Sequence, residues 1–181
     1  KETIPSGTSR MRIVYHLGAH CTDEERLLRC LLKNRGVLAE EGIIVPPPSR
    51  YRNLLRDTAI ALKGNPASRD TQAIVLDQIM DEDQAERLVF SWESFLSYPQ
   101  WVLKDALYPA AGERIRAFTQ IFPEIEAEFH LALRNPATFL PDLLARRILR
   151  ALGVGRHVVA LALEFLDGAG QLRHGGADVG Q

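Results

Sequence analysis

The chain has 181 residues, of which 46% are hydrophobic and 25% are charged, proportions that are ordinary for a soluble globular domain with a sizeable core. Its formal net charge of −1 provides no basic field, which argues against nucleic acid or an anionic membrane as a partner. No apolar run in the sequence is long enough to span a bilayer.

Three regions are expected along the chain. Residues 1–10 carry proline, glycine, serine and threonine and are expected to form a flexible leader. Residues 11–166 are predicted to form a single α/β domain. Residues 167–181 are rich in glycine, so a disordered tail is predicted there.

The first structured stretch predicts a strand, a tight turn and a helix. Residues 12–17 form a short, mostly apolar run that is typical of a buried strand, and Gly18 permits a sharp turn. Leucines then recur at helical spacing, which predicts a helix over about residues 23–35. In an α/β protein this first turn is where a phosphate is usually held, because backbone N–H groups and the helix dipole point at it.

The same residues also support a simpler interpretation, in which the loop only begins a helix. Thr22 followed by Glu25 is a capping-box pattern, and Asp23, Glu24 and Glu25 place three carboxylates in the first turn. Such carboxylates repel a phosphate, because like charges about 4 Å apart cost on the order of 4 kcal/mol at an effective dielectric near 20. This charge pattern favours a helix cap over an intact phosphate loop.

The two cysteines bear on two questions, whether the chain forms a disulfide in its cellular compartment and whether a thiol acts as a nucleophile. Cys21 and Cys30 lie nine positions apart, more than two helical turns, which is too far for an easy disulfide and favours a reducing cytoplasm. Carboxylates beside Cys21 raise a thiol pKa, so Cys21 is predicted to be a bystander rather than a nucleophile.

Helices and strands alternate through the middle of the chain. Apolar spacing predicts helices over residues 53–63 and 68–80, the second capped by Ser68. Residues 87–92 predict a second core strand, followed by Glu93 and Ser94. In a parallel sheet the carboxyl end of a strand faces the ligand crevice, although both residues also suit a strand end and a helix cap.

The next segments combine aromatic and strand patterns. Residues 101–108 predict an aromatic and aliphatic cluster on a short helix, either as core or as a platform for adenine. A helix is predicted over residues 113–121, and residues 127–134 predict a strand with His130 as a core histidine. Arg134 then lies at the carboxyl end of that strand, where a guanidinium can fork onto a phosphate.

The remaining pattern completes the predicted fold. A helix is expected over residues 136–152, followed by an apolar run at residues 158–163 that suits either a strand or a short helix. Strands that alternate with helices predict a three-layer α/β/α domain with a mainly parallel sheet.

Several of these segments together resemble the sulfotransferase family, particularly its bacterial members. The matching residues are His16, Gly18, His20 and Thr22 in the first loop, and then the segments 90–96, 108–109, 121–123 and 131–141. The resemblance implies a fold like that of P-loop nucleoside-triphosphate hydrolases. It also implies the donor 3′-phosphoadenosine 5′-phosphosulfate, with no metal expected.

The resemblance assigns roles to individual residues. The donor's phosphosulfate end is expected at the loop residues Gly18, Ala19, Cys21 and Thr22. Cys21 stands where the family has a lysine, and Asp23-Glu24 stand where it has Gly-Thr. Arg134 matches the arginine that holds the donor's 3′-phosphate, and Asp142 replaces the accompanying serine. The available bases are His16, His20 and Glu93.

Two functions remain open from the sequence. The first is transfer of a sulfuryl group to an unknown hydroxyl or amine acceptor, which needs anion-stabilising groups and a base. The second is a non-catalytic relative that keeps the fold to bind a partner, such as another protein, or a ligand, its donor site closed by Asp23, Glu24 and Asp142.

Overall fold

The computed structural model describes residues 11–23, 25–82 and 84–151. The chain divides into two compact units, the first ending at Leu133 and the second beginning at Arg134. The leader, the tail and the apolar run at residues 158–163 lie outside the described residues, and a single domain over residues 11–166 stays a prediction.

The first unit is built on a four-stranded parallel sheet. Its strands are β1 (Arg12–Gly18), β2 (Ile43–Ile44), β3 (Arg87–Ser91) and β6 (Glu126–Leu131), and their order in the sheet is β2-β3-β1-β6. All three strand pairs are parallel. The predicted α/β class and the parallel sheet are confirmed.

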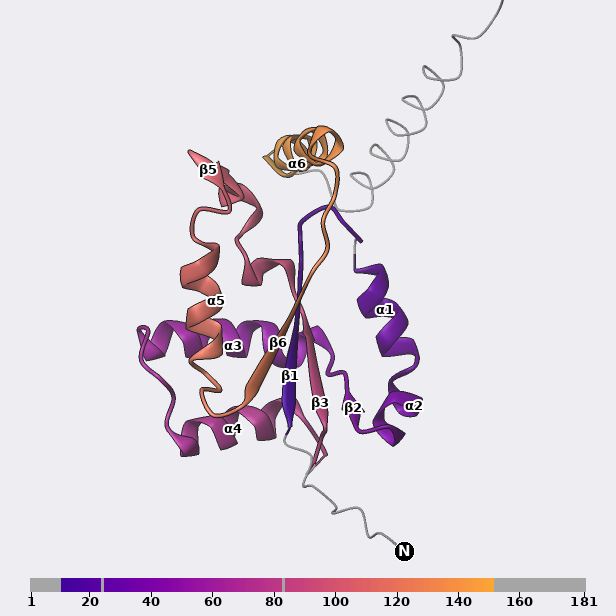
Figure 1. Cartoon of the computed structure of the whole chain (residues 1–181), viewed down its shortest axis with the longest axis vertical. Coiled ribbons are helices and arrows are strands. Elements are labelled where there is room, and N and C mark those ends of the chain that lie inside the picture. Colours follow the sequence, from indigo (N-terminus) through magenta and orange to yellow (C-terminus); the bar gives the residue numbers. More distant parts are fainter. Residues whose placement is uncertain (1–10, 24, 83, 152–181) are drawn as a thin grey trace, which may run out of the picture. The chain divides into compact units, whose positions relative to one another are not determined.

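The connections between strands place helices on both faces of this sheet. Helices α1 (Arg26–Lys33) and α2 (Arg35–Glu40) lead from β1 out to β2. The path then reverses through α3 (Pro48–Leu62) and α4 (Arg69–Ile79) to β3, and through α5 (Ala111–Thr119) to β6. Because parallel crossovers are right-handed, the reversal puts the two groups of helices on opposite faces, as Figure 1 shows.

Local chemistry explains where two of these helices begin. Pro48 occupies the first turn of α3, where its missing N–H costs nothing and its fixed φ suits a helix. This helix therefore begins five residues before the predicted start at residue 53. The Ser68 hydroxyl accepts a hydrogen bond from the Thr71 N–H at 3.2 Å, so the predicted cap of α4 is confirmed.

The predicted helix at residues 101–108 is wrong. Two 3-10 turns, η1 (Glu93–Phe95) and η2 (Pro99–Trp101), lead instead into an antiparallel hairpin of β4 (Leu103–Lys104) and β5 (Ala106–Leu107). Asp105 makes the turn with φ 60°, a conformation that Asp tolerates better than most residues. The side chains of Leu103, Leu107 and Trp101 are exposed rather than gathered in a core.

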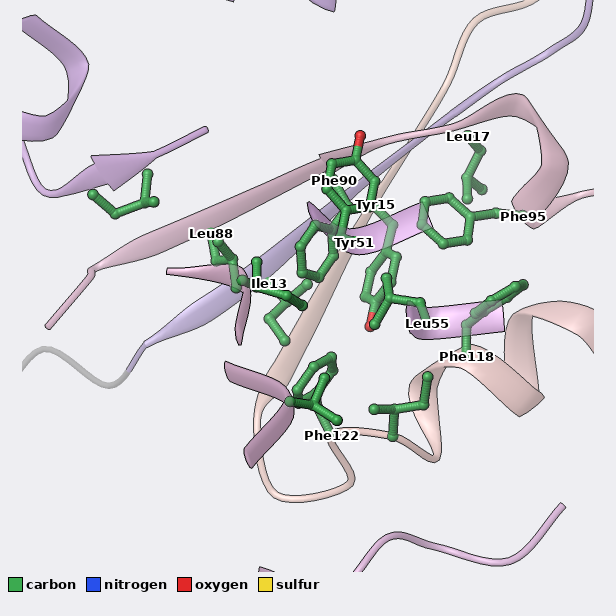
Figure 2. Packing of buried hydrophobic residues seen from close by; sticks show 14 of the residues in the cluster. Ile13, Tyr15, Leu17, Tyr51, Leu55, Leu88, Phe90, Phe95, Phe118 and Phe122 are labelled. Atoms are coloured by element: carbon green, nitrogen blue, oxygen red, sulfur yellow. The ribbon is translucent and has the colours of Figure 1, made fainter. Parts of the chain in front are cut away.

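The main core lies where β1 and β3 meet α3 and α5 (Figure 2). Ile13, Tyr15 and Leu17 alternate along β1 and are almost fully buried. The Tyr15 ring meets Phe90 and Phe95 edge to face, with centroids 5.8 and 5.3 Å apart, a favoured aromatic geometry. This alternation leaves His16 on the opposite face of the sheet.

The second unit contains helix α6 (Pro136–Ala151). Its start is fixed by Asn135, whose side-chain oxygen accepts a hydrogen bond from the Ala137 N–H at 2.9 Å. The helix predicted over residues 136–152 is therefore present through residue 151, and residue 152 lies outside the described part of the chain.

Candidate site at the carboxyl end of β1

The turn after β1 begins at Gly18, which has φ +83°. A Cβ added there would lie only 3.2 Å from the Cβ of Glu93. Gly18 is therefore needed twice, once for its left-handed backbone and once so that the segment after β3 can approach. This contact brings the loop and Glu93 together.

Backbone groups of the loop are engaged by the protein itself. The Ala19 N–H donates to the Ala132 carbonyl at 3.1 Å, and the Ala132 N–H donates back to the Gly18 carbonyl at 2.6 Å. The His20 N–H donates to the hydroxyl oxygen of Tyr108 at 3.1 Å. Of the predicted donor-binding residues, Gly18 and Ala19 thus form a bridge to the end of β6.

The start of α1 is capped by the Asp23 carboxylate. One oxygen accepts from the Glu25 N–H at 3.1 Å and the other from the Leu27 N–H at 3.2 Å. Glu25 itself is left-handed, with φ 63°, and α1 begins only at Arg26. An internal anion therefore occupies the helix N-terminus that a phosphate would use.

The predicted capping box is wrong in its residues, although the loop does begin a capped helix. The Thr22 hydroxyl donates backwards to the Ala19 carbonyl at 2.6 Å. The Glu25 carboxylate instead pairs with Arg52 at 2.8 Å. Asp23 takes the capping role because the left-handed Glu25 shifts the first helical residue to Arg26.

His20 lies at the centre of a short polar chain. Its side chain is buried, its Nδ1 lies 3.0 Å from the Tyr108 hydroxyl, and its Nε2 lies 4.0 Å from the half-exposed Glu93 carboxylate. Burial raises the pKa of Tyr108 to about 12, so the phenol keeps its proton at pH 7. In the tautomer where Tyr108 donates to Nδ1, the ring proton of His20 faces Glu93.

His16 belongs to a separate polar group. Its Nδ1 lies 2.8 Å from the Ser91 hydroxyl, and burial lowers the pKa of His16, which favours the neutral ring at pH 7. The Tyr51 hydroxyl donates to the Ser91 carbonyl at 2.7 Å and accepts from the Ser91 N–H at 3.1 Å. Through Ser91, His16 is tied to the end of β3 rather than to Glu93.

Cys21 has φ 60° and is buried. A lysine at this position in the family needs to reach a phosphosulfate, whereas Cys21 offers a short side chain inside the protein. The described residues thus provide no cation at the position where the resemblance expects one.

In the second unit, Arg134 precedes α6 and is held by side chains of that helix. The guanidinium forms an ion pair with Asp142, and its Nε donates to the Thr138 hydroxyl at 3.1 Å. Both charged side chains are largely covered, at 25% and 20% exposure. The arginine that the resemblance assigns to the donor's 3′-phosphate is thus paired with the carboxylate that replaces the family's serine.

Sequence reasoning missed Tyr108 as a partner of the loop. It lies 88 residues from His20, and its sequence neighbours indicate only an aromatic cluster. Arg52, which pairs with Glu25 and also donates to the Ser91 carbonyl at 3.0 Å, carried no signal either. Neither link follows a local spacing rule, because both depend on how the crossovers fold.

Within residues 11–23, 25–82 and 84–151, no group of three or more histidine, cysteine or acidic side chains is placed to hold a metal ion. In the same part of the chain, no helix has the length and apolar character required to cross a membrane. No protein-family model, curated protein or solved structure shows a significant match to the chain.

Proposed function

We propose that this chain is a sulfotransferase-like α/β protein that acts as a non-catalytic binding module. The observation that carries the proposal is the Asp23 carboxylate, which accepts two N–H groups at the start of α1. In a protein that uses this loop for a donor nucleotide, those groups face a phosphate. Here an internal anion has taken them.

A phosphate has to overcome two costs to bind this loop. It must replace hydrogen bonds to a charged acceptor, each contributing roughly 1.5–3 kcal/mol. It must also approach a carboxylate of the same sign, at a cost on the order of 4 kcal/mol for about 4 Å at an effective dielectric near 20. Tight binding is about 8 kcal/mol at micromolar affinity, so these terms are large enough to abolish it.

Two further features support a closed donor site. Cys21 is buried where the resemblance expects a lysine, and the Arg134 guanidinium already pairs with Asp142. Both cationic contacts that the family uses for 3′-phosphoadenosine 5′-phosphosulfate are therefore missing or engaged. The role that we propose for the fold is therefore binding, with a protein as the expected partner.

A variant that restores the family's loop tests this explanation. The triple change Cys21→Lys, Asp23→Gly and Glu24→Thr removes two carboxylates and adds a cation. We expect it to bind 3′-phosphoadenosine 5′-phosphate in calorimetric titrations where the wild type does not. The matched control is Asp77→Asn, which removes an exposed carboxylate on α4. A folded triple variant that gains no affinity would refute the closed-loop explanation.

Sulfuryl transfer is the second candidate, and the chain from Tyr108 through His20 to Glu93 favours it. A half-exposed carboxylate next to a buried histidine can accept the proton of a hydroxyl or amine as the sulfuryl group moves to it. The donor, 3′-phosphoadenosine 5′-phosphosulfate, would leave as the bisphosphate, and no metal is expected.

An activity assay separates the two candidates. Release of 3′-phosphoadenosine 5′-phosphate is followed with simple phenol and amine acceptors, for the wild type, Glu93→Gln and the control Glu113→Gln. The binding-module proposal expects no release from any of them. Release that is lost only in Glu93→Gln would instead establish transfer.

A further inference from the structure

Strand β6 forms one edge of the parallel sheet, because β1 is its single neighbour among the described strands. Just beyond β6, the N–H and the carbonyl of Ala132 both bond to the turn after β1. The N–H and C=O of one residue point to the same side of a strand, and the side alternates along the chain. The main-chain groups of Ala127, Phe129 and Leu131 therefore point away from β1, toward the open edge.

This edge lacks the features that usually prevent edge strands from pairing. Proline and lysine are common protections, and β6 contains neither of them. Its two carboxylates, Glu126 and Glu128, are paired with Arg12 at 3.1 and 3.2 Å. The side chains of Phe129 and Leu131 are 44% and 51% exposed. The edge thus offers main-chain hydrogen-bonding groups together with exposed apolar side chains.

We propose that β6 pairs antiparallel with β6 of a second copy of this chain, so that one sheet continues through both copies. The two-fold axis passes through Phe129 and stands perpendicular to the sheet. Such an interface uses the same surface of both copies, so its residues have to complement one another. The sequence of β6 meets this condition in one register.

Hydrogen bonding favours the register centred on Phe129. Only registers centred on a residue suit a two-fold axis perpendicular to the sheet, and the choices with good overlap are Glu128, Phe129 and His130. Centring on Phe129 makes two kinds of hydrogen-bonded pair, Phe129 with itself and Ala127 with Leu131, the second occurring twice. All the outward main-chain groups are then used. The other two centres each leave one of these outward residues without a partner.

Side-chain charge selects the same register. With Phe129 at the centre, Glu128 lies directly opposite His130 of the second copy, and the symmetry repeats this pair. His130 already lies 2.7 Å from Glu128 of its own chain, so the four side chains form one alternating row. Centring on Glu128 would place two carboxylates opposite each other, which is unfavourable. Centring on His130 would place two imidazoles together and leave Glu128 opposite Ala132.

Apolar residues also meet on one face of the extended sheet. Phe129 stacks on Tyr15 with ring centroids 5.4 Å apart, so it lies on the face that carries the main core. In the proposed register Phe129 meets its own copy there, and Ala127 meets Leu131. Aromatic and aliphatic cross-strand pairs of this kind stabilise antiparallel strands.

Self-association goes beyond the binding role proposed above and does not depend on it. The pairing strand is separate from the capped start of α1, so the two proposals can fail separately. Titration with the bisphosphate nucleotide reports on Asp23 and its neighbours, whereas the mass of the protein in solution reports on the β6 edge.

Disulfide formation in the full chain locates the axis. Cys30, which is exposed, is first replaced by serine, while Cys21 is buried and is kept. In this background Phe129→Cys should give a disulfide-linked dimer on mild oxidation, because the two Cα atoms lie about 5.5 Å apart in a hydrogen-bonded pair. Glu128→Cys and His130→Cys should each cross-link poorly alone, at about 7–8 Å along the diagonal, and well when mixed.

A charge exchange tests the same register without cysteines. Sedimentation of the wild type should show a reversible dimer whose fraction rises with concentration. His130→Glu places a carboxylate opposite Glu128 and should weaken the dimer about tenfold. Adding Glu128→His restores opposite partners and should recover most of the affinity. The matched control is Gln78→Glu, which adds an exposed carboxylate on α4.

Three results would overturn the proposal. The first is a folded wild type that sediments as a monomer up to about millimolar concentration, well above the range of weak specific dimers. The second is efficient cross-linking of Glu128→Cys or His130→Cys alone while Phe129→Cys stays monomeric. The third is a dimer that His130→Glu leaves unchanged, since its interface would then lie elsewhere.

Discussion

Tyr108 supports the loop through a single hydroxyl. It accepts the His20 N–H and contacts the His20 ring nitrogen, and the ring of His20 is buried. The change Tyr108→Phe leaves both groups of His20 without this partner, so a loss of about 1–3 kcal/mol in the free energy of unfolding is expected. Urea denaturation measures it, with Tyr98→Phe as the control. Equal stability of Tyr108→Phe and wild type would contradict the role.

His16 predicts a dependence of stability on pH. Burial is the largest cause that holds its pKa below the ordinary value of 6.5 in the folded state. Attraction to Asp23 acts in the opposite direction, and His130 adds to the lowering. As pH falls below 6.5, the unfolded chain binds a proton more readily than the folded one, so stability decreases.

The His16 prediction is tested by measuring the free energy of unfolding from pH 7.5 to 5. The wild type should lose stability over this range, and His16→Gln should show a shallower slope because the titrating group is gone. The slope, rather than the stability at one pH, is the readout, since the substitution also removes the Ser91 contact. Identical slopes would show that His16 does not titrate differently on folding.

At the scale of elements, α4 depends on its cap. Ser68→Ala removes the acceptor for the Thr71 N–H, and a loss of about 1 kcal/mol is expected. Ser68→Asp keeps an acceptor at this position and should retain most of the stability. Thermal or urea unfolding of the three proteins decides the matter, and an unchanged Ser68→Ala would show that solvent satisfies the helix start equally well.

Elements with strong local signals were predictable. Three of them are confirmed: the strand in residues 87–92, the Ser68 cap of α4 and the helix α5. Each was indicated by a pattern only a few residues long. The hairpin at residues 103–107 was missed because its turn depends on a left-handed Asp105, which no composition rule separates from a helix end.

The candidate site was only partly predictable for a related reason. Position at strand ends drew attention to Glu93 and the loop, and the structure places Gly18 beside Glu93; their part in a functional site stays a prediction. The role of Asp23 as the acceptor at the helix start was assigned to Thr22 and Glu25, because one left-handed residue moves the register of the cap. Whether a residue such as Glu25 adopts a left-handed conformation depends on the tertiary fold, and the local sequence pattern does not reveal it.

At the scale of the whole molecule, stability of the first unit rests on the core between the sheet and its helices. Leu55 of α3 is 1% exposed and Ile60 of the same helix is 66% exposed. Leu55→Ala should cost about 2–5 kcal/mol because it leaves a cavity, whereas Ile60→Ala should stay within about 1 kcal/mol. Urea denaturation compares them, and similar losses would contradict the assigned core.

The loop after β1, which we propose is closed to a donor nucleotide, connects a single residue to the function of the whole molecule. A residue, Asp23, caps an element, α1, at the edge of the sheet where ligands of α/β proteins are bound. The same atoms cannot serve the cap and a phosphate together. The function proposed for the molecule therefore depends on whether a nucleotide phosphate can displace the Asp23 carboxylate from the start of α1.

Calorimetric titration of the wild-type protein with 3′-phosphoadenosine 5′-phosphate, at low and moderate salt, tests this most directly. We expect no heat of binding up to millimolar nucleotide in protein that unfolds cooperatively. Micromolar binding that is lost in Arg134→Ala would contradict it, because a working donor site would then exist despite Asp23 and Cys21.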